Sequence, residues 1–395
     1  MSRIFITGIG IITAIGNNAN ENRASLINGV CGINTKTKYP SKYSGVLPFG
    51  EIALTNTELM DKLSIHNKGI TRTTLLAIHA IEEAISDAQL SVGEISGYDT
   101  AFISATTVGG MSKTEELYHD VMATREPSPY ITSYDVSAST IFIQEHYCIK
   151  GYSNTINTAC SSSANAVMLG ARMMKGGMAE RAIVGGVDCL SKMTINGFNA
   201  LQILSDEVCR PFDKNRKGLN LGEGAAFLVL EKEENCTHKK IYAEVKGYGN
   251  ANDAYHASST SDNGDGPYFS MQAALRTAQL NASEIDFINA HGTATENNDL
   301  TESRAMMRLF NDVPLLMSSK ANVGHTLGAA GAVNAIYSAL SLANEEIYAG
   351  LNFNDPAEDT GLTPNLHYKK KALKHVMANA FGFGGNCTSL ILSRI

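Results

Sequence analysis

Apolar strands alternate with helical segments along the whole chain. Residues 181–190 (RAIVGGVDCL) and 241–249 (IYAEVKGYG) have the apolar composition of buried strands. Residues 71–90 have apolar side chains at helical spacing, and the Gly176-Gly177 pair ends a predicted helix that begins near residue 162. Strands that alternate with helices form mixed or mainly parallel sheets with both faces covered, so this order predicts an α/β fold.

The same order of strands and helices recurs in the second part of the chain and suggests two related α/β halves. We expect the first half at residues 1–240 and the second at residues 241–395. The most polar connector, residues 231–240 (EKEENCTHKK), marks the boundary. Each half places reactive side chains just after a strand, where a helix begins.

Composition limits the classes of function. Only 18% of the 395 residues are charged, against roughly 25% in an average soluble protein, which favours a body partly buried in an oligomer interface. A net charge of −7 argues against nucleic acid as the partner. Seven scattered cysteines, no signal peptide pattern and no apolar run of about 18 residues predict a cytoplasmic protein without membrane insertion.

Cys160 lies in the stretch NTACSSSANAV, where a predicted strand ends and a helix begins. A lone cysteine at such a place is most often a small buried hydrophobe. The positive end of a helix dipole, however, stabilises the reactive thiolate. The unpaired backbone N–H groups there also suit an oxyanion. Taken alone, Cys160 fits both interpretations.

Two histidines also follow apolar strands, His291 in NAHGTATENND and His325 in SSKANVGHTLGAAGAVN. Lys320 comes directly after the apolar run LLMSS, and burying its charge is costly unless it is paired or functional. Asp299 and Glu302 end the first histidine loop and are its candidate partners. No His-x3-His spacing supports a metal site, so we expect no metal.

These motifs and the glycine-aromatic stretch FGFGG (381–385) resemble the β-ketoacyl-acyl-carrier-protein synthases, elongating condensing enzymes of the thiolase superfamily. The resemblance extends from residue 3 to near residue 393 and includes residues 209–231 (CRPFDKNRKGLNLGEGAAFLVLE). It implies a thiolase-like fold whose two α/β halves form an αβαβα layered sandwich.

The resemblance also implies a decarboxylative Claisen condensation. Cys160 would take the growing acyl chain from a carrier protein, and its N–H and that of Phe383 would form an oxyanion hole. His291 and His325 would donate N–H bonds to the enolate formed from a malonyl thioester. By the same resemblance, two histidines at these positions distinguish elongating enzymes from initiating ones, which have a histidine and an asparagine there.

Further roles come from the same resemblance. Lys320, held by Glu302 with Asp299 close by, would order the charges around the histidines, or would form a plain structural ion pair. The other residues assigned in this way are Thr293 and Thr295 for the pantetheine arm, Phe383 as a gate, and Phe198 and Val108 for the acyl pocket. Core packing and ordinary loop roles are the alternatives for these side chains.

The implied partner is an acidic acyl carrier protein that brings its own phosphopantetheine, so no separate cofactor is expected. Lys62, Lys68 and Arg72 match the docking segment of the family, with a solvated helix face as the alternative. We expect a homodimer or a heterodimer with a chain-length subunit.

Two features depart from the general family pattern. Asn386-Cys387 replaces the usual Thr-Asn pair after GFGG, which questions how the Phe383 loop is held. Residues 190–226 resemble more closely the synthases of aryl polyene and flexirubin pigment clusters. A non-catalytic chain-length subunit would typically lack the cysteine, and a thiolase would need a second one in a Cys-x-Gly loop. Acyl chain length and saturation are not set by the sequence.

Overall fold

The computed structural model describes residues 2–124, 128 and 130–395. In this part of the chain, ten strands form one mixed sheet in the order β3-β2-β4-β5-β1-β6-β12-β11-β7-β8. The strands are β1 (Ile4–Thr13), β2 (Thr100–Ala105), β3 (Ser153–Ile156), β4 (Arg181–Asp188), β5 (Gly224–Lys232), β6 (Ala243–Asn252), β7 (Phe287–Asn289), β8 (Leu315–Met317), β11 (His375–Phe381) and β12 (Asn386–Ser393).

The sheet consists of two sets of five strands with the same topology. Outward from the central β1–β6 pair, the orders are β1-β5-β4-β2-β3 and β6-β12-β11-β7-β8. In each set, the two innermost pairings are antiparallel and the two outermost are parallel. Strand for strand in chain order, the second set repeats the first, which confirms the predicted two related α/β halves. The division after residue 240 stays a prediction.

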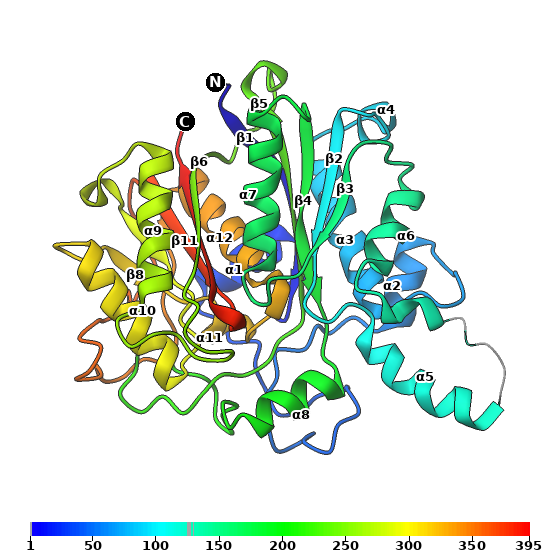
Figure 1. The fold of residues 1–395 in the computed structure, drawn as a ribbon, viewed down its shortest axis with the longest axis horizontal. Helices are drawn as coiled ribbons and strands as arrows, with labels where there is room; N and C mark the ends of the chain where they lie inside the picture. The colour runs from blue at the N-terminus through cyan, green and yellow to red at the C-terminus, as the bar shows by residue number, and fades with distance from the viewer. Residues whose placement is uncertain (1, 125–127, 129) are drawn as a thin grey trace.

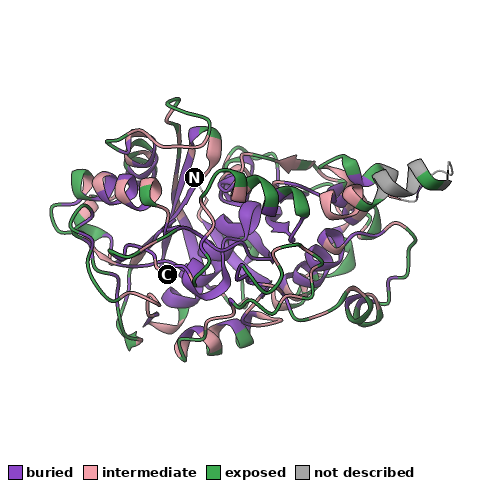
Figure 2. Ribbon diagram, turned by 90° about the horizontal axis from the view of Figure 1, so that it is seen from below, coloured by how far each residue is buried: buried purple, intermediate pink, exposed green. Residues whose placement is uncertain are grey.

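The two sets of strands form two β layers, and helices between them and outside them complete five layers (Figure 1). Helix α3 (Arg72–Asp87) packs on β1 and β5, and helix α9 (Asp265–Ala278) packs on β6 and β12. Helices α7 (Ser162–Lys175) and α12 (Ala330–Asn344) contact each other in the middle, against β4 and β11 respectively. Figure 2 shows the central helices and strands as the buried part of the molecule. The αβαβα sandwich is therefore confirmed.

Helix α11 (Lys320–Val323) is buried inside the molecule. The other α-helices of the described residues are α1 (Ala19–Ile27), α2 (Asn56–Leu63), α4 (Val92–Ile95), α5 (Met111–Thr124), α6 (Ala138–His146), α8 (Lys192–Ala200) and α10 (Glu296–Leu309), and a pair of small strands is formed by β9 (Glu346–Ile347) and β10 (Lys369–Lys370). Among the described residues, no helix is long and apolar enough to cross a membrane.

One glycine in the central strand of each half lets a helix pack directly on that strand. A Cβ at Gly10 of β1 would lie 1.9 Å from the carbonyl oxygen of Ala80 in α3. A Cβ at Gly249 of β6 would lie 2.2 Å from the carbonyl oxygen of Ser270 in α9. Real Cβ atoms do not approach so closely, so only glycine permits this packing. Gly10 of β1 and Gly249 of β6 are thus required by the packing of these helices.

Candidate active site

The nucleophile candidate lies at the start of a central helix. Strand β3 ends at Ile156, earlier than expected, and a turn leads through Ala159 to Cys160. Ala159 has a φ of 53°, a conformation that costs energy for a residue with a Cβ. Ser161 is the N-cap of α7, so Cys160 stands at the positive end of this helix. The Cys160 side chain is buried.

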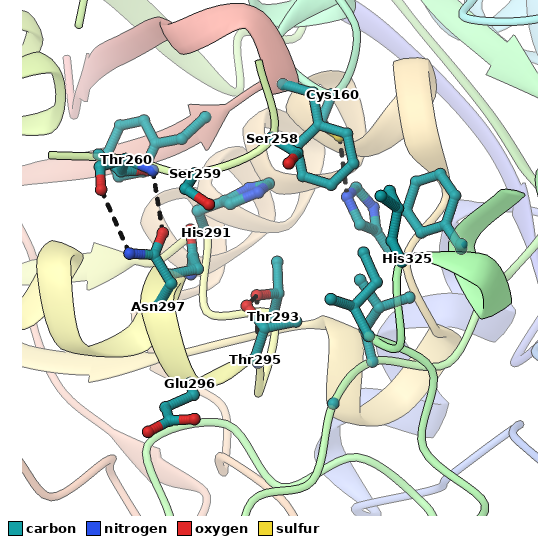
Figure 3. Close-up of a pocket in the computed structure, with 18 of the residues that line it drawn as sticks. Cys160, Ser258, Ser259, Thr260, His291, Thr293, Thr295, Glu296, Asn297 and His325 are labelled. Atoms are coloured by element: carbon teal, nitrogen blue, oxygen red, sulfur yellow. Dashed lines mark hydrogen bonds between the residues drawn. The ribbon is translucent and has the colours of Figure 1, made fainter. Parts of the chain in front are cut away.

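His325 contacts the thiol directly. Its Nε2 lies 3.1 Å from the Sγ of Cys160, and Figure 3 shows the two side chains facing each other. The rings of His291 and His325 meet edge to face, with centroids 5.4 Å apart. One cysteine and two histidines from distant parts of the chain therefore surround one point, as the sequence predicted.

The far sides of both imidazole rings face hydrogen-bond donors. The Nδ1 of His325 accepts from the N–H of Leu327 at 3.2 Å. The Nδ1 of His291 faces the Lys320 ammonium at 3.3 Å, and an ammonium has no lone pair to offer. A neutral ring whose Nδ1 accepts must carry its proton on Nε2. Both rings are thus oriented as Nε2–H donors.

The same geometry bears on metal binding. The ligand atoms of Cys160, His291 and His325 lie within 4.8 Å of one another, a spacing that suits a metal ion. Histidines that hold metals donate their other ring N–H to an acceptor, which fixes the tautomer for ligation. Here both Nδ1 atoms face donors, and the Lys320 cation would repel a second cation. The donor set therefore fits an anionic oxygen better than a metal.

Lys320 is buried beside the histidines. Its ammonium also donates to the backbone carbonyl of His291. Burial lowers the pKa of Lys320 to about 8, while the charge of Glu302 acts in the opposite direction. Burial and the Lys320 charge together hold the pKa of each histidine well below its usual range, so both rings are neutral.

The two carboxylates of α10 order the first histidine loop. Glu302 accepts from the backbone N–H groups of His291 and Gly292 at 2.9 and 2.8 Å. Asp299 accepts from the backbone N–H groups of Thr293 and Phe212 at 2.9 and 2.7 Å. The expectation that Glu302 holds Lys320 needs correction, because its oxygens bind the loop backbone and act on Lys320 through charge.

The Phe383 turn closes over the sulfur. The backbone N–H groups of Phe383 and of Cys160 both face the thiol. A Cβ at Gly382 would lie 2.5 Å from the carbonyl oxygen of Thr158, so glycine is required for this approach. Burial raises the pKa of Cys160 to about 11, with the Lys320 charge and these N–H groups acting against it. The sequence predicted that the helix dipole and the backbone N–H groups stabilise the Cys160 thiolate, and burial opposes this effect.

A cavity of about 700 Å³ leads to this point. Cys160, both histidines, Thr293 and Thr295 line it. The Phe198 and Phe383 rings stack across it, with centroids 5.5 Å apart. Val108 is buried, and it is not among the described residues that line this cavity. A role for Val108 in chain length stays a prediction.

Some polar residues that line the cavity escaped the sequence analysis. Ser258, Ser259 and Thr260 line it from the loop after β6 (Figure 3). The Asn297 side chain holds this loop, since it accepts from the N–H of Thr260 at 2.9 Å and donates to its carbonyl at 3.2 Å. The only local signal is a polar stretch, which is typical of any surface loop.

The three basic residues expected to dock a carrier protein differ in exposure. Lys62 and Lys68 are exposed. Arg72 is 15% exposed and forms an ion pair with Glu223 at 2.7 Å. Its guanidinium also donates to the backbone carbonyl of Leu54, so the Arg72 charge is used for contacts within the protein. The docking role of this segment stays a prediction.

The fold and the site together define an α/β enzyme in which a buried cysteine and two N–H-donating histidines line one cavity. Family models for the β-ketoacyl synthase N-terminal and C-terminal domains match residues 1–235 and 242–354. The chain belongs to the β-ketoacyl synthase family.

Relatives of known name cover the whole chain. It is 33% identical to a putative mitochondrial 3-oxoacyl-[acyl-carrier-protein] synthase of Schizosaccharomyces pombe, over 100% of this chain and 99% of that one. It is 32% identical to 3-oxoacyl-[acyl-carrier-protein] synthase 2 of Staphylococcus aureus, over 99% and 98%.

Two similar solved structures are named for a chain length factor as well as a ketosynthase. The ishigamide ketosynthase/chain length factor matches with a TM-score of 0.93 and 29% identity, over 100% of this chain and 99% of that one. A chain in the structure of the ketosynthase ApeO in complex with its chain length factor ApeC, from Xenorhabdus doucetiae, matches with a TM-score of 0.86 and 28% identity, over 100% of this chain and 98% of that one.

Proposed function

We propose that this protein condenses an acyl chain, held as a thioester on Cys160, with malonyl-acyl carrier protein to give 3-oxoacyl-acyl carrier protein. The observation that carries this proposal is the orientation of His291 and His325, which both present Nε2–H donors beside the sulfur. A thiol and two neutral donors suit an acyl thioester that must become an enolate.

Acyl transfer is the first step. The Cys160 sulfur attacks the thioester carbonyl of the acyl carrier protein, and the oxygen of the tetrahedral intermediate accepts from the N–H groups of Phe383 and Cys160. The carbon–sulfur bond to pantetheine then breaks, and the pantetheine thiol leaves with the proton that Cys160 gave up. The enzyme keeps the acyl group as a new thioester.

Condensation follows when the malonyl thioester enters. Its oxygen accepts from the Nε2–H groups of His291 and His325 while the carbon–carboxylate bond breaks and carbon dioxide leaves. The electron pair becomes an enolate, which attacks the acyl carbonyl on Cys160. The bond to sulfur breaks, and Cys160 leaves as a thiolate that takes up one proton from solvent.

The cavity suits the arm that brings these groups. Thr293 and Thr295 line it, and we infer that their hydroxyls bind the amides of the pantetheine arm. This arm arrives with the carrier protein, so we propose that no separate cofactor is needed. An acidic carrier protein would dock near the exposed Lys62 and Lys68. A cytoplasmic location is part of the same proposal.

A specific observation favours a second form of this function. One matching structure is described as a ketosynthase/chain length factor, and another is a ketosynthase in complex with its chain length factor. This supports a heterodimer in which this chain is the active subunit, as in a polyene pigment pathway. Because Cys160, His291 and His325 are all in place, the chain is not proposed as the inactive subunit.

One experiment tests the proposal. The protein is incubated with acyl carrier proteins that carry different acyl chains, one of them an aryl polyenoyl chain, and the mass of the Cys160 peptide is measured. We expect acylation of Cys160 and none in Cys160→Ala. If no donor acylates the parent protein, the proposal is wrong. A preference for aromatic polyenes would favour the pigment pathway.

A further inference from the structure

The Asn386 side chain lies at the junction of three elements near the nucleophile. Its Oδ1 accepts from the Oγ of Ser161 at 2.8 Å, from the Nδ2 of Asn165 at 2.9 Å and from the Nδ2 of Asn250 at 2.9 Å. Ser161 directly follows Cys160, Asn165 lies in α7, and Asn250 lies in β6. One amide oxygen therefore joins the nucleophile turn and helix α7 of the first half to strand β6 of the second half.

The orientation of this amide is set by its neighbours. The Oδ1 of Asn165 accepts from the hydroxyl of Thr388 at 2.9 Å, so the Nδ2 of Asn165 is the atom that faces Asn386. Asn250 also donates to the Oδ1 of Asn165, at 3.1 Å. The donors that meet at Asn386 therefore require its oxygen rather than its nitrogen.

The backbone of Asn386 holds the other side of the site. Its carbonyl accepts from the N–H of Gly382 at 2.8 Å, which closes the turn that carries Phe383. Within this turn, the N–H of Gly385 donates to the carbonyl of Gly382 at 3.1 Å. The same residue thus binds the Phe383 turn through its backbone and the Cys160 turn through its side chain.

We propose that Asn386 is a positioning residue that keeps the Phe383 N–H aligned with the Cys160 sulfur. The inference rests on the proposed function, in which this N–H stabilises the oxyanion of acyl transfer. The two histidines that serve decarboxylation are held from the opposite side, by Leu327 and Lys320. Loss of the Asn386 amide therefore acts on one half-reaction and spares the other.

The neighbouring residue provides a matched control. Cys387 is buried at the start of β12 and packs against Gly266, where its sulfur lies 2.9 Å from the position of an added Cβ. Cys387→Ala changes packing one residue away and leaves the contacts of the Asn386 side chain in place.

The test separates the two half-reactions of the full-length protein. Acylation of Cys160 by an acyl carrier protein is followed by mass spectrometry, and release of carbon dioxide from malonyl carrier protein is followed separately. In Asn386→Ala we expect acylation to slow by about tenfold or more and decarboxylation to stay within about twofold, since misplacing one oxyanion donor affects only the step it serves. Cys387→Ala should behave like the parent in both assays.

A second variant keeps the test informative if Asn386→Ala does not fold. Ser161→Ala removes one of the donors to Asn386 and should slow acylation in the same direction by a smaller factor. Equal loss of both half-reactions, or no loss of either, would overturn the inference. If no acyl carrier protein acylates the parent protein, the proposed function itself is wrong.

Discussion

At the scale of single residues, the charge of Lys320 controls the protonation of the site. Burial and this charge lower the pKa of His291 and His325, so both rings remain neutral donors below the usual imidazole range. The same charge opposes the rise in the pKa of Cys160. A single buried ammonium thus favours the neutral histidines and the thiolate together.

Replacing Lys320 should move the acid limb of the pH–rate profile. In Lys320→Met the cation is gone, so the pKa of each histidine rises and protonation begins at higher pH. We expect decarboxylation to fail at a higher pH than in the parent when its rate is measured across pH 4–8, roughly the range of perturbed imidazoles. Lys371→Met, at an exposed lysine, is the control. An unchanged acid limb would contradict this role.

Substitutions of the histidines and of the cysteine should impair different half-reactions. His291→Ala and His325→Ala each remove one donor to the enolate oxygen, so we expect decarboxylation of malonyl carrier protein to fall by roughly 10²–10³. Cys160→Ala should abolish condensation and retain decarboxylation, measured as released carbon dioxide. Full decarboxylation in either histidine variant would refute the assigned donor role.

At the scale of elements, the site depends on how closely the Phe383 turn approaches the start of α7. This approach joins the turn between β11 and β12 to a helix that begins more than half a chain earlier in the sequence. Gly382 makes it sterically allowed, and Asn386 stabilises it by hydrogen bonds. The oxyanion hole is therefore a property of two elements rather than of one motif.

Gly382→Ala should damage acyl transfer at this contact. The new Cβ would lie 2.5 Å from the carbonyl of Thr158 and would push the Phe383 N–H away from the sulfur. We expect slower acylation of Cys160, measured by peptide mass against time. Gly93→Ala is the control, because a Cβ there meets nothing within 4 Å. Parent-like acylation in Gly382→Ala would show that the turn has room to shift.

At the scale of the whole molecule, the two halves place reactive residues at equivalent connections. Cys160 lies between β3 and α7, and His325 lies between β8 and α12. Because β3 and β8 hold the same place in the two sets of strands, the central helices bring both connections together between the halves. The site therefore exists only when both halves are assembled.

The equivalence of the halves also predicts matched effects on stability. Gly10→Ala and Gly249→Ala each drive a Cβ into the backbone of an outer helix, at α3 and α9 respectively. We expect each to lower the free energy of unfolding by about 1–3 kcal/mol, the usual cost of overpacking. Denaturant unfolding measures this, with Gly93→Ala as the reference. A neutral effect in one half alone would contradict the equivalence.

By itself the sequence determined the alternation of strands and helices, because apolar periodicity is a local feature. It also singled out Cys160, His291, Lys320 and His325 as site candidates, but only because their motifs occur together and in the order that the family resemblance implies. Only the tertiary structure decided the proton positions of the histidines, the internal use of Arg72 and the place of Asn386. Each of these depends on contacts between residues far apart in the chain, such as Ser161 with Asn386, which no local pattern encodes.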